Sequence, residues 1–288
     1  MVLGVTMSIV KEIKSIDLSS YTLIMTGIAV LFSILSALVL TIGIGIISPG
    51  NIGIAVFIIP TIIVGTFMYT IYNSFSQGLF YNLLSTKLNA IKFTLEENQI
   101  VKISPNETAT MLAVIATIQV LLLYLVTVFI LPLVLNATIQ TLMFGGQELL
   151  AYELYQFLIL INQPMTIILF IFGTFVITFV FTLIGVYIYN ILAKKGKAIT
   201  VELSNENEMT ALDSIDLMSL AIAVAIINGI LTLIFAIIML ISGGNIATLL
   251  TNVISSIITG FIEAALFAIF YNFLAPKIGK LKLELIDQ

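Results

Sequence analysis

Apolar residues dominate the chain in six long runs, separated by shorter segments that are richer in polar residues. Runs of roughly 20 or more apolar residues are long enough to cross a bilayer as helices. Because Pro60 removes a backbone donor from the second run, we expect the crossing helix there to begin near Pro60 and to end at Leu84. The pattern predicts six membrane-spanning helices, at residues 21–47, 52–84, 108–135, 164–193, 218–241 and 246–275.

The lysines divide the connections between these spans into two kinds. All eleven cationic residues are lysines, and the connections around 48–51, 136–163 and 242–245 hold none of them. Lysine-rich short connections mark the cytoplasmic side of a membrane protein. We therefore predict a multi-pass protein of the cell membrane with both termini in the cytoplasm. The four lysine groups are Lys11 and Lys14; Lys87, Lys92 and Lys102; Lys194, Lys195 and Lys197; and Lys277, Lys280 and Lys282.

The connection at 136–163 is long and fairly apolar, which raises the possibility of a seventh span. Glu148, Glu153 and Gln156 interrupt it, and a seventh span would place some lysine groups outside the cell. We therefore expect a helix that lies on the outer membrane surface. No signal peptide is expected, because no basic segment followed by a short apolar core opens the sequence.

Each even-numbered span runs into the same 15-residue pattern, which reads YNLLSTKLNAIKFTL, YNILAKKGKAITVEL and YNFLAPKIGKLKLEL. A Ser-Ile-Asp-Leu sequence also precedes the first and the fifth span, at 15–18 and 214–217. We predict three two-helix modules, at residues 1–98, 99–210 with an outer insertion at 136–163, and 211–288. Two spans return the chain to its starting side, so the repeats are parallel. The repeated positions are Tyr81, Asn82 and Lys87; Tyr189, Asn190 and Lys195; and Tyr271, Asn272 and Lys277.

The end of each 15-residue pattern alternates between apolar and polar residues, as at Ile91, Phe93 and Leu95. A period of two with one apolar face is typical of a half-buried strand. Glu96–Asn98 is then a turn that leads into a partner strand at 99–103. The alternative is an amphipathic segment lying on the membrane. The expected fold class is all-α integral membrane, with six transmembrane helices as three parallel two-helix repeats and short cytoplasmic β-strands.

With these features the modules resemble an uncharacterised family of archaeal and bacterial two-helix membrane domains, described only as a domain of unknown function. The resemblance rests on the head Lys14–Ser20 and on the tail Tyr271–Ala275 with Gly279 and Leu281–Leu285. The Gly pair of the family is reduced here to Ala198 or Gly279-Lys280, and is Asn89-Ala90 in the first copy. The resemblance covers the first and third modules well and the middle one poorly. It implies a fold and a membrane location, but no activity.

Composition excludes several classes of chemistry. Hydrophobic residues make up 60% of the 288 residues, charged residues 9%, and the mean hydropathy is +1.20, which excludes a water-soluble domain. The sequence has no His, Cys, Trp or Arg, so thiol chemistry, Cys/His zinc sites, Ser-His-Asp triads and arginine clamps are impossible. We expect no enzyme activity, no cofactor, no metal and no nucleic-acid partner. The expected partner is the lipid bilayer, with anionic lipid near the cytoplasmic lysines.

Glu263 is the one charged residue well inside a predicted span. A charge at mid-bilayer costs on the order of 3 kcal/mol, so such a residue normally faces the protein interior or a cavity. It shares one helix face with Asn252, Ser255, Ser256, Thr259 and Gly260. This stripe is either a packing face, with a protonated Glu263 bonded to a neighbour, or a polar path for protons or cations.

Three further polar residues lie inside spans and complete the candidate set: Asn73, Asn228 and Gln119. Asn73 has the same repeat position as Glu263, whereas Phe181 fills that position in the middle module. The Tyr-Asn pairs are expected to be structural, with Tyr as an interface anchor and Asn as a helix cap. The first hypothesis for function is a non-catalytic structural or interaction scaffold. The alternative is a small channel or transporter with a polar path near Glu263 and Asn73.

Overall fold

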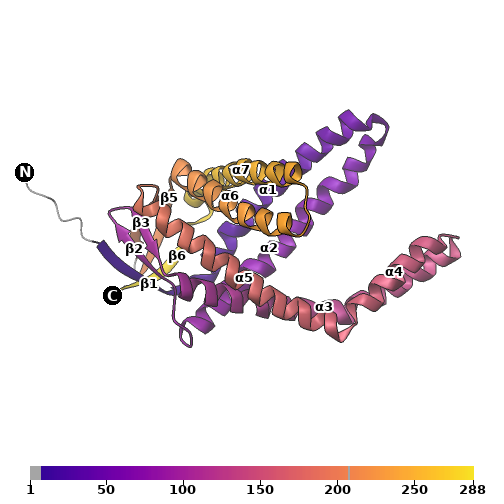
Figure 1. The fold of residues 1–288 in the computed structure, drawn as a ribbon, viewed down its shortest axis with the longest axis horizontal. Coiled ribbons are helices and arrows are strands. Elements are labelled where there is room, and N and C mark those ends of the chain that lie inside the picture. The colour runs from indigo at the N-terminus through magenta and orange to yellow at the C-terminus, as the bar shows by residue number, and fades with distance from the viewer. Residues whose placement is uncertain (1–7, 207) are drawn as a thin grey trace, which may run out of the picture. The chain divides into compact units, whose positions relative to one another are not determined.

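The computed structural model describes residues 8–206 and 208–288, in which long helices alternate with short strands (Figure 1). The helices are α1 (Leu18–Ile47), α2 (Ala55–Ser85), α3 (Pro105–Phe144), α4 (Glu148–Ile161), α5 (Pro164–Lys194), α6 (Leu217–Ile241) and α7 (Ile246–Ile278), with a 3-10 segment η1 (Pro49–Ile54). The strands are β1 (Ser8–Ile16), β2 (Lys92–Glu96), β3 (Gln99–Ile103), β4 (Ile199–Glu206), β5 (Met209–Ile215) and β6 (Lys282–Asp287).

The chain forms two compact units, which we describe separately. The first unit, Met1–Met111 with Leu183–Gln288, holds every strand together with α1, α2, α6 and α7. The second unit, Leu112–Thr182, holds α4 and most of α3 and α5.

The six strands of the first unit close into one barrel. Their order around the barrel is their order in the chain, every neighbouring pair is antiparallel, and β6 pairs with β1. A tight turn joins β2 to β3, and β4 and β5 are separated by only two residues, whereas helices are inserted between the strands of each other consecutive pair. Six strands enclose a space so narrow that side chains fill it.

The barrel corrects the expected fold class. Strands are present where the alternating tails predicted them, as β2, β4 and β6, and the expected hairpin partner is β3. The six long apolar helices of the expected class are present, but β1 and β5 were not expected, and the six strands close into a barrel, so the expectation of only short strands is wrong. The alternative interpretation of the tails, as segments lying on the membrane, is wrong as well.

β-bulges explain why two of the strands escaped the period-two search. In β1 the register places Ile13 opposite Leu285 but Ile16 opposite Leu283, so β1 has one residue more than its partner. The same extra residue separates Ile100 from Ile103 in β3 and Leu212 from Ile215 in β5. An extra residue shifts the apolar positions from a spacing of two to a spacing of three, which conceals a strand in the sequence pattern.

The register also divides the strand residues between two faces. Leu95, Val201 and Ile215 are buried and lie on the same apolar face. The residues between them in sequence include charged side chains such as Lys92, Glu202 and Lys282, which lie on the opposite face. The barrel therefore has a small apolar core and a charged outer surface.

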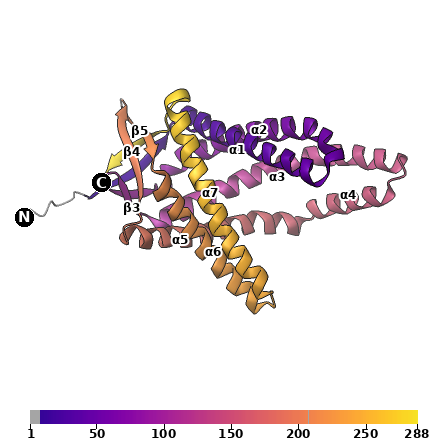
Figure 2. The ribbon, with the colours of Figure 1, turned by 90° about the horizontal axis from the view of Figure 1, so that it is seen from above.

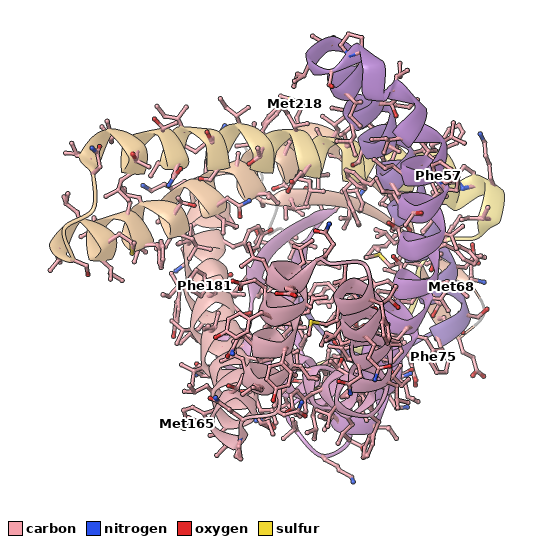
Figure 3. All side chains as sticks on the ribbon, turned by 90° about the vertical axis from the view of Figure 1, so that its right-hand side faces the viewer. Phe57, Met68, Phe75, Met165, Phe181 and Met218 are labelled. Carbon is pink, nitrogen blue, oxygen red and sulfur yellow. The ribbon has the colours of Figure 1, made fainter. Side chains whose placement is uncertain are left out.

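Six helical segments are long and apolar enough to cross a membrane, as expected for a multi-pass membrane protein. Large apolar side chains are exposed along their surfaces, and Figure 3 shows Phe57, Met68 and Phe75 following one another along α2. Exposed apolar surface of this extent suits lipid rather than water. The six segments are Leu18–Ile47, Ile52–Ser85, Pro105–Phe144, Pro164–Lys194, Leu217–Ile241 and Ile246–Ile278.

Two helices depart from their predicted bounds. Pro60 lies inside α2, which begins at Ala55, so the prediction that the helix begins at Pro60 is wrong. Pro60 is the sixth residue of α2, so the helix continues through it with one backbone hydrogen bond missing near its start. α3 continues through Pro132 to Phe144, and its 40 residues span about 60 Å. A helix, α4, occupies the part of 136–163 where a surface helix was expected, and it is not one of the six segments long enough to span a membrane.

The two complete helix pairs of the first unit pack by different means. α6 and α7 lie side by side (Figure 2) through small residues, with Gly229 against Ile257 and Gly260 against Asn228. α1 and α2 pack through hydroxyl and amide groups as well: the Tyr21 hydroxyl donates to Gln77 Oε1 over 2.8 Å. Small residues let helix backbones approach closely in a membrane, where no hydrophobic force drives helices together.

The second unit is entirely helical. The Tyr124 hydroxyl of α3 donates to the Ile161 carbonyl at the end of α4, over 2.9 Å. Beside this contact, α3, α4 and α5 enclose a cavity of about 440 Å³ whose lining is almost wholly apolar and includes Leu123, Phe157 and Phe170.

Candidate functional site

The repeated tyrosines connect the two strands of their own module. The Tyr81 hydroxyl donates to the Ile13 carbonyl of β1 over 2.6 Å and accepts the Ile91 N–H beside β2 over 3.3 Å. The hydroxyl thus takes the place of a backbone hydrogen bond between the two strands, at the point where the helices separate them. The same pair of bonds joins Tyr189 to Ile100 and Ile199, and Tyr271 to Leu212 and Leu281.

The repeated asparagines hold the strand that precedes each helix pair. Asn82 Nδ2 donates to the Ile16 carbonyl and Asn82 Oδ1 accepts the Ile16 N–H, both over 2.8 Å. This amide therefore pairs with a strand residue as another strand would, and the predicted role of these asparagines as helix caps is wrong. Asn190 holds Ile103 and Asn272 holds Ile215 in the same way, at 2.8–2.9 Å.

A third contact joins each tail to the module that follows it. The Lys92 N–H donates to Ser104 Oγ over 3.1 Å, and the Thr200 N–H donates to Ser219 Oγ over 3.0 Å. The Lys282 N–H completes the circle by donating to Ser20 Oγ over 3.1 Å. We call the tyrosine, asparagine and serine contacts together the strand ties. Because the last tail reaches the first helix, the strand ties form a ring.

The repeated lysines have no common contact. Lys87 and Lys195 are exposed at the helix ends, whereas Lys277 Nζ lies 3.2 Å from the centroid of the Phe273 ring. Lysine at this position therefore serves no single packing role, in contrast to the Tyr-Asn pair. All eleven lysines belong to the first unit.

An ion network covers the outer surface of the barrel. Lys280 Nζ lies 2.6 Å from Asp213 Oδ1 and 3.0 Å from Glu206 Oε1, and Lys282 pairs with Glu206 as well. Hydrogen bonds from Lys280 lower the pKa of Asp213 and of Glu206, and the same bonds raise the pKa of Lys280. On β6, hydrogen bonds from Lys14 and then Ser15 lower the pKa of Glu284. These ion pairs join the third module to the second through Glu206 and to the first through Lys14.

Glu263 lies at the edge of an open cavity between α1, α6 and α7. The cavity has a volume of about 500 Å³ and is lined by Phe32, Leu220, Val224, Glu263, Ala264 and Phe267. The Glu263 side chain is exposed, and among the described residues it makes no hydrogen bond and no ion pair. The interpretation in which a neighbouring side chain bonds Glu263 therefore finds no such partner in residues 8–206 and 208–288. We call this space the Glu263 cavity.

The polar stripe around Glu263 divides into two rows. Ser256 and Gly260 face α6, where Ser256 Oγ lies 3.5 Å from the Asn228 carbonyl and the Asn228 side chain packs against Gly260. Asn252, Ser255, Thr259 and Glu263 form the other row, which is exposed. The structure therefore brings Asn228, Ser256 and Gly260 together. Glu263 lies apart from them, in the lining of the Glu263 cavity.

Two predicted polar residues lie elsewhere. Asn73 is half-buried on α2 and does not line the Glu263 cavity. Gln119 is on α3 in the second unit. Throughout the described parts of the chain, no three acidic side chains come together as a metal site.

Sequence reasoning missed the two phenylalanines of the Glu263 cavity. Phe267 stands one helical turn after Glu263, a spacing that places the ring and the carboxylate on one face and is visible in the sequence. Phe32 comes from α1, and no sequence pattern indicates that it meets α7. Ser20 and Ser219 were also missed, although each stands three residues after the Asp of the repeated Ser-Ile-Asp-Leu.

Comparisons with protein-family models, with curated proteins and with solved structures found no match.

Proposed function

We propose that this chain is a non-catalytic structural or interaction scaffold of the cell membrane, in which a cytoplasmic barrel fixes three helix pairs. The observation that carries the proposal is the ring of strand ties: the asparagine contacts fasten the first strand of each module to its own helix, and the serine contacts hold each module to the next. Residues that repeat three times hold the backbone together, and no catalytic set of residues is among them. We propose further that the modules are related to the two-helix family that the sequence resembles.

The orientation in this proposal follows from the lysines. They stand on or beside the barrel strands, and lysine-rich segments remain in the cytoplasm during insertion. The barrel and both termini are then cytoplasmic, where exposed lysines such as Lys87 and Lys195 contact anionic lipid headgroups.

Single cysteines test the orientation, because the chain has none of its own. Cysteines in place of Gln147 and Asn245 are expected to react with an impermeant maleimide added to intact cells. Cysteines in place of Lys87 or Lys195 are expected to react only after the cells are opened. Labelling at position 195 from outside contradicts the arrangement.

A cut chain tests whether the barrel holds the modules together. A protease site inserted between Glu97 and Asn98, both exposed in the β2–β3 turn, separates the chain after the first module. The two fragments are expected to co-purify in mild detergent, because the β1–β6 and β2–β3 pairs and the strand ties still join them. Fragments that separate at once contradict the scaffold.

The second candidate function is a small channel or transporter, and one observation favours it: the exposed carboxylate in the Glu263 cavity. Intramembrane carboxylates commonly mark ion or proton pathways. Proteoliposomes loaded with a panel of ions and small solutes distinguish the two functions. A scaffold gives no flux with the wild type, whereas a transporter gives flux that Glu263→Leu abolishes without loss of the fold.

A further inference from the structure

Glu263 lies near the middle of α7, far from the charged residue at the end of that helix. It is 17 residues after Ile246 and 15 before Ile278, the two ends of α7, which places it about 22–25 Å from either end. None of the eleven lysines lines the Glu263 cavity. A carboxylate in apolar surroundings is stabilised by a cation within a few ångströms. A cation that pairs with Glu263 must therefore come from outside the chain.

The walls of the Glu263 cavity determine which cation fits. Leu220, Val224 and Ala264 present only hydrocarbon, and Phe32 and Phe267 present aromatic rings. Phe270 holds the Phe32 ring edge-to-face, with ring centroids 5.0 Å apart and an interplanar angle of 78°. Aromatic rings attract cations through their faces and contact apolar substituents equally well.

These walls disfavour a bare inorganic cation. Calcium and magnesium require several oxygen ligands, and this cavity has one carboxylate and no other acidic side chain in its lining. An inorganic cation would lose its hydration shell and receive too few oxygens in return. An organic cation loses little hydration, because its charge is spread and its substituents are already apolar.

We propose that the Glu263 cavity is a binding site for a monovalent organic cation with apolar substituents, such as a quaternary ammonium or phosphonium ion, which reaches it from the membrane. Glu263 supplies the counter-charge, Phe32 and Phe267 contact the cation through their rings, and Leu220 and Val224 contact the substituents. A volume of about 500 Å³ lies in the range of small-ligand sites, roughly 300–1,000 Å³. The proposal does not rest on the scaffold function, since binding without flux is compatible with a scaffold.

Equilibrium dialysis of radiolabelled tetraphenylphosphonium against the full chain tests the proposal. The protein is held in nanodiscs of zwitterionic lipid, so that lipid charge does not attract the probe, and empty nanodiscs give the background. We expect saturable binding to the wild type. Glu263→Gln, which keeps the shape and removes the charge, is expected to weaken binding about tenfold or more, and Phe267→Leu about threefold. Glu153→Gln, an exposed acid on α4 outside the cavity, is the matched control and is expected to bind as the wild type does.

Two further measurements keep the test decisive if Glu263→Gln folds poorly. Val224→Phe narrows the cavity and leaves the carboxylate in place, so it is expected to remove binding. Triphenylphosphine oxide, a neutral probe with the same rings, is expected not to compete with the cation. Equal binding to wild type and Glu263→Gln, or equal competition by the neutral probe, overturns the proposal, because the cavity is then only an apolar surface. Displacement by millimolar sodium or calcium overturns it in favour of an inorganic site.

Discussion

At the barrel end of the helices the same side-chain contacts recur in every module, whereas in the middle of the spans the three modules have different residues. At the barrel end Tyr81, Tyr189 and Tyr271 make the same contacts in every module. Eight residues before each of these tyrosines the chain has Asn73, Phe181 and Glu263, which share no chemistry. Identical contacts impose one backbone frame, and the positions inside the membrane are then free to differ. All three modules thus share the tyrosine contacts that fix the backbone, whereas the charged residue inside a span, Glu263, is found in the third module alone.

Breaking one strand tie is the strongest way to test this contrast. In Asn82→Leu, the Ile16 N–H and carbonyl lose both side-chain partners, which is expected to lower the free energy of unfolding by about 2–4 kcal/mol. Asn190→Leu is expected to act alike, because Asn190 makes the same two bonds to Ile103. Thermal unfolding in detergent, followed by circular dichroism, measures the loss. The matched control is Asn252→Leu, an exposed asparagine on α7, and equal destabilisation by the control contradicts the role of the ties.

The close helix packing of the third module gives the next largest effect. A methyl group added at Gly229 would lie 2.5 Å from Ile257 Cγ1, and a β-branched side chain has few rotamers with which to yield. We expect Gly229→Ala to destabilise the α6–α7 pair by about 1–3 kcal/mol. Gly65→Ala on α2 is the control, since no atom lies within 4 Å of the added methyl. That change is expected to be neutral or slightly stabilising, because alanine favours helices. Detergent-resistance and unfolding curves compare the two variants.

Acid is expected to loosen the outer surface of the barrel and to leave the spans unaffected. The pKa values of Glu206, Asp213 and Glu284 are lowered from 4.5, 3.8 and 4.5 in the folded chain. Their contribution to stability is therefore complete above these ordinary values and is lost as the pH falls through the lowered ones. The effect is small, because exposed ion pairs contribute little.

Unfolding temperatures between pH 7 and pH 3 measure this loss, and Lys280→Met provides the comparison. Without Lys280, Glu206 and Asp213 lose their first hydrogen-bond partner, so the dependence on pH is expected to flatten. An unchanged pH profile in Lys280→Met contradicts the assignment of the acid sensitivity to this network.

The smallest expected effect lies in the β2–β3 turn. Glu97 has a φ of 54°, a left-handed conformation that most side chains disfavour and asparagine tolerates. Glu97→Asn is expected to stabilise the barrel by about 0.5 kcal/mol. Glu96→Asn, one residue earlier in an extended strand, is expected to give no gain, and the two unfolding temperatures show whether turn strain is the cause.

Much of the architecture follows from sequence patterns alone. Apolar runs indicated the six spans, the alternating tails indicated β2, β4 and β6, and the turn before Gln99 indicated a hairpin. Barrel closure did not follow, because bulges conceal the pattern of β1 and β5 and because pairing between β1 and β6 joins residues about 270 positions apart. Local patterns contain no information about such distant pairs.

The site was predicted in part, for a similar reason. Glu263 was identified because a charge in an apolar run is conspicuous in any sequence. The Glu263 cavity was not, because its wall combines α1 with α6 and α7, and the meeting of these helices depends on tertiary packing. The Tyr-Asn pairs were recognised by repetition, but their partners lie on strands that the sequence pattern conceals.

The β1–β6 pair can form only after β6 has been synthesised. During synthesis β1 leaves the ribosome about 270 residues before β6. The edge of β1 that pairs with β6 therefore stays unpaired while the helix pairs enter the membrane. A chain interrupted before Lys282 keeps two unpaired edges, on β1 and on β5, and such edges invite pairing with other chains. Barrel closure therefore depends on β6, and until β6 pairs, the open edges of β1 and β5 remain accessible to other chains.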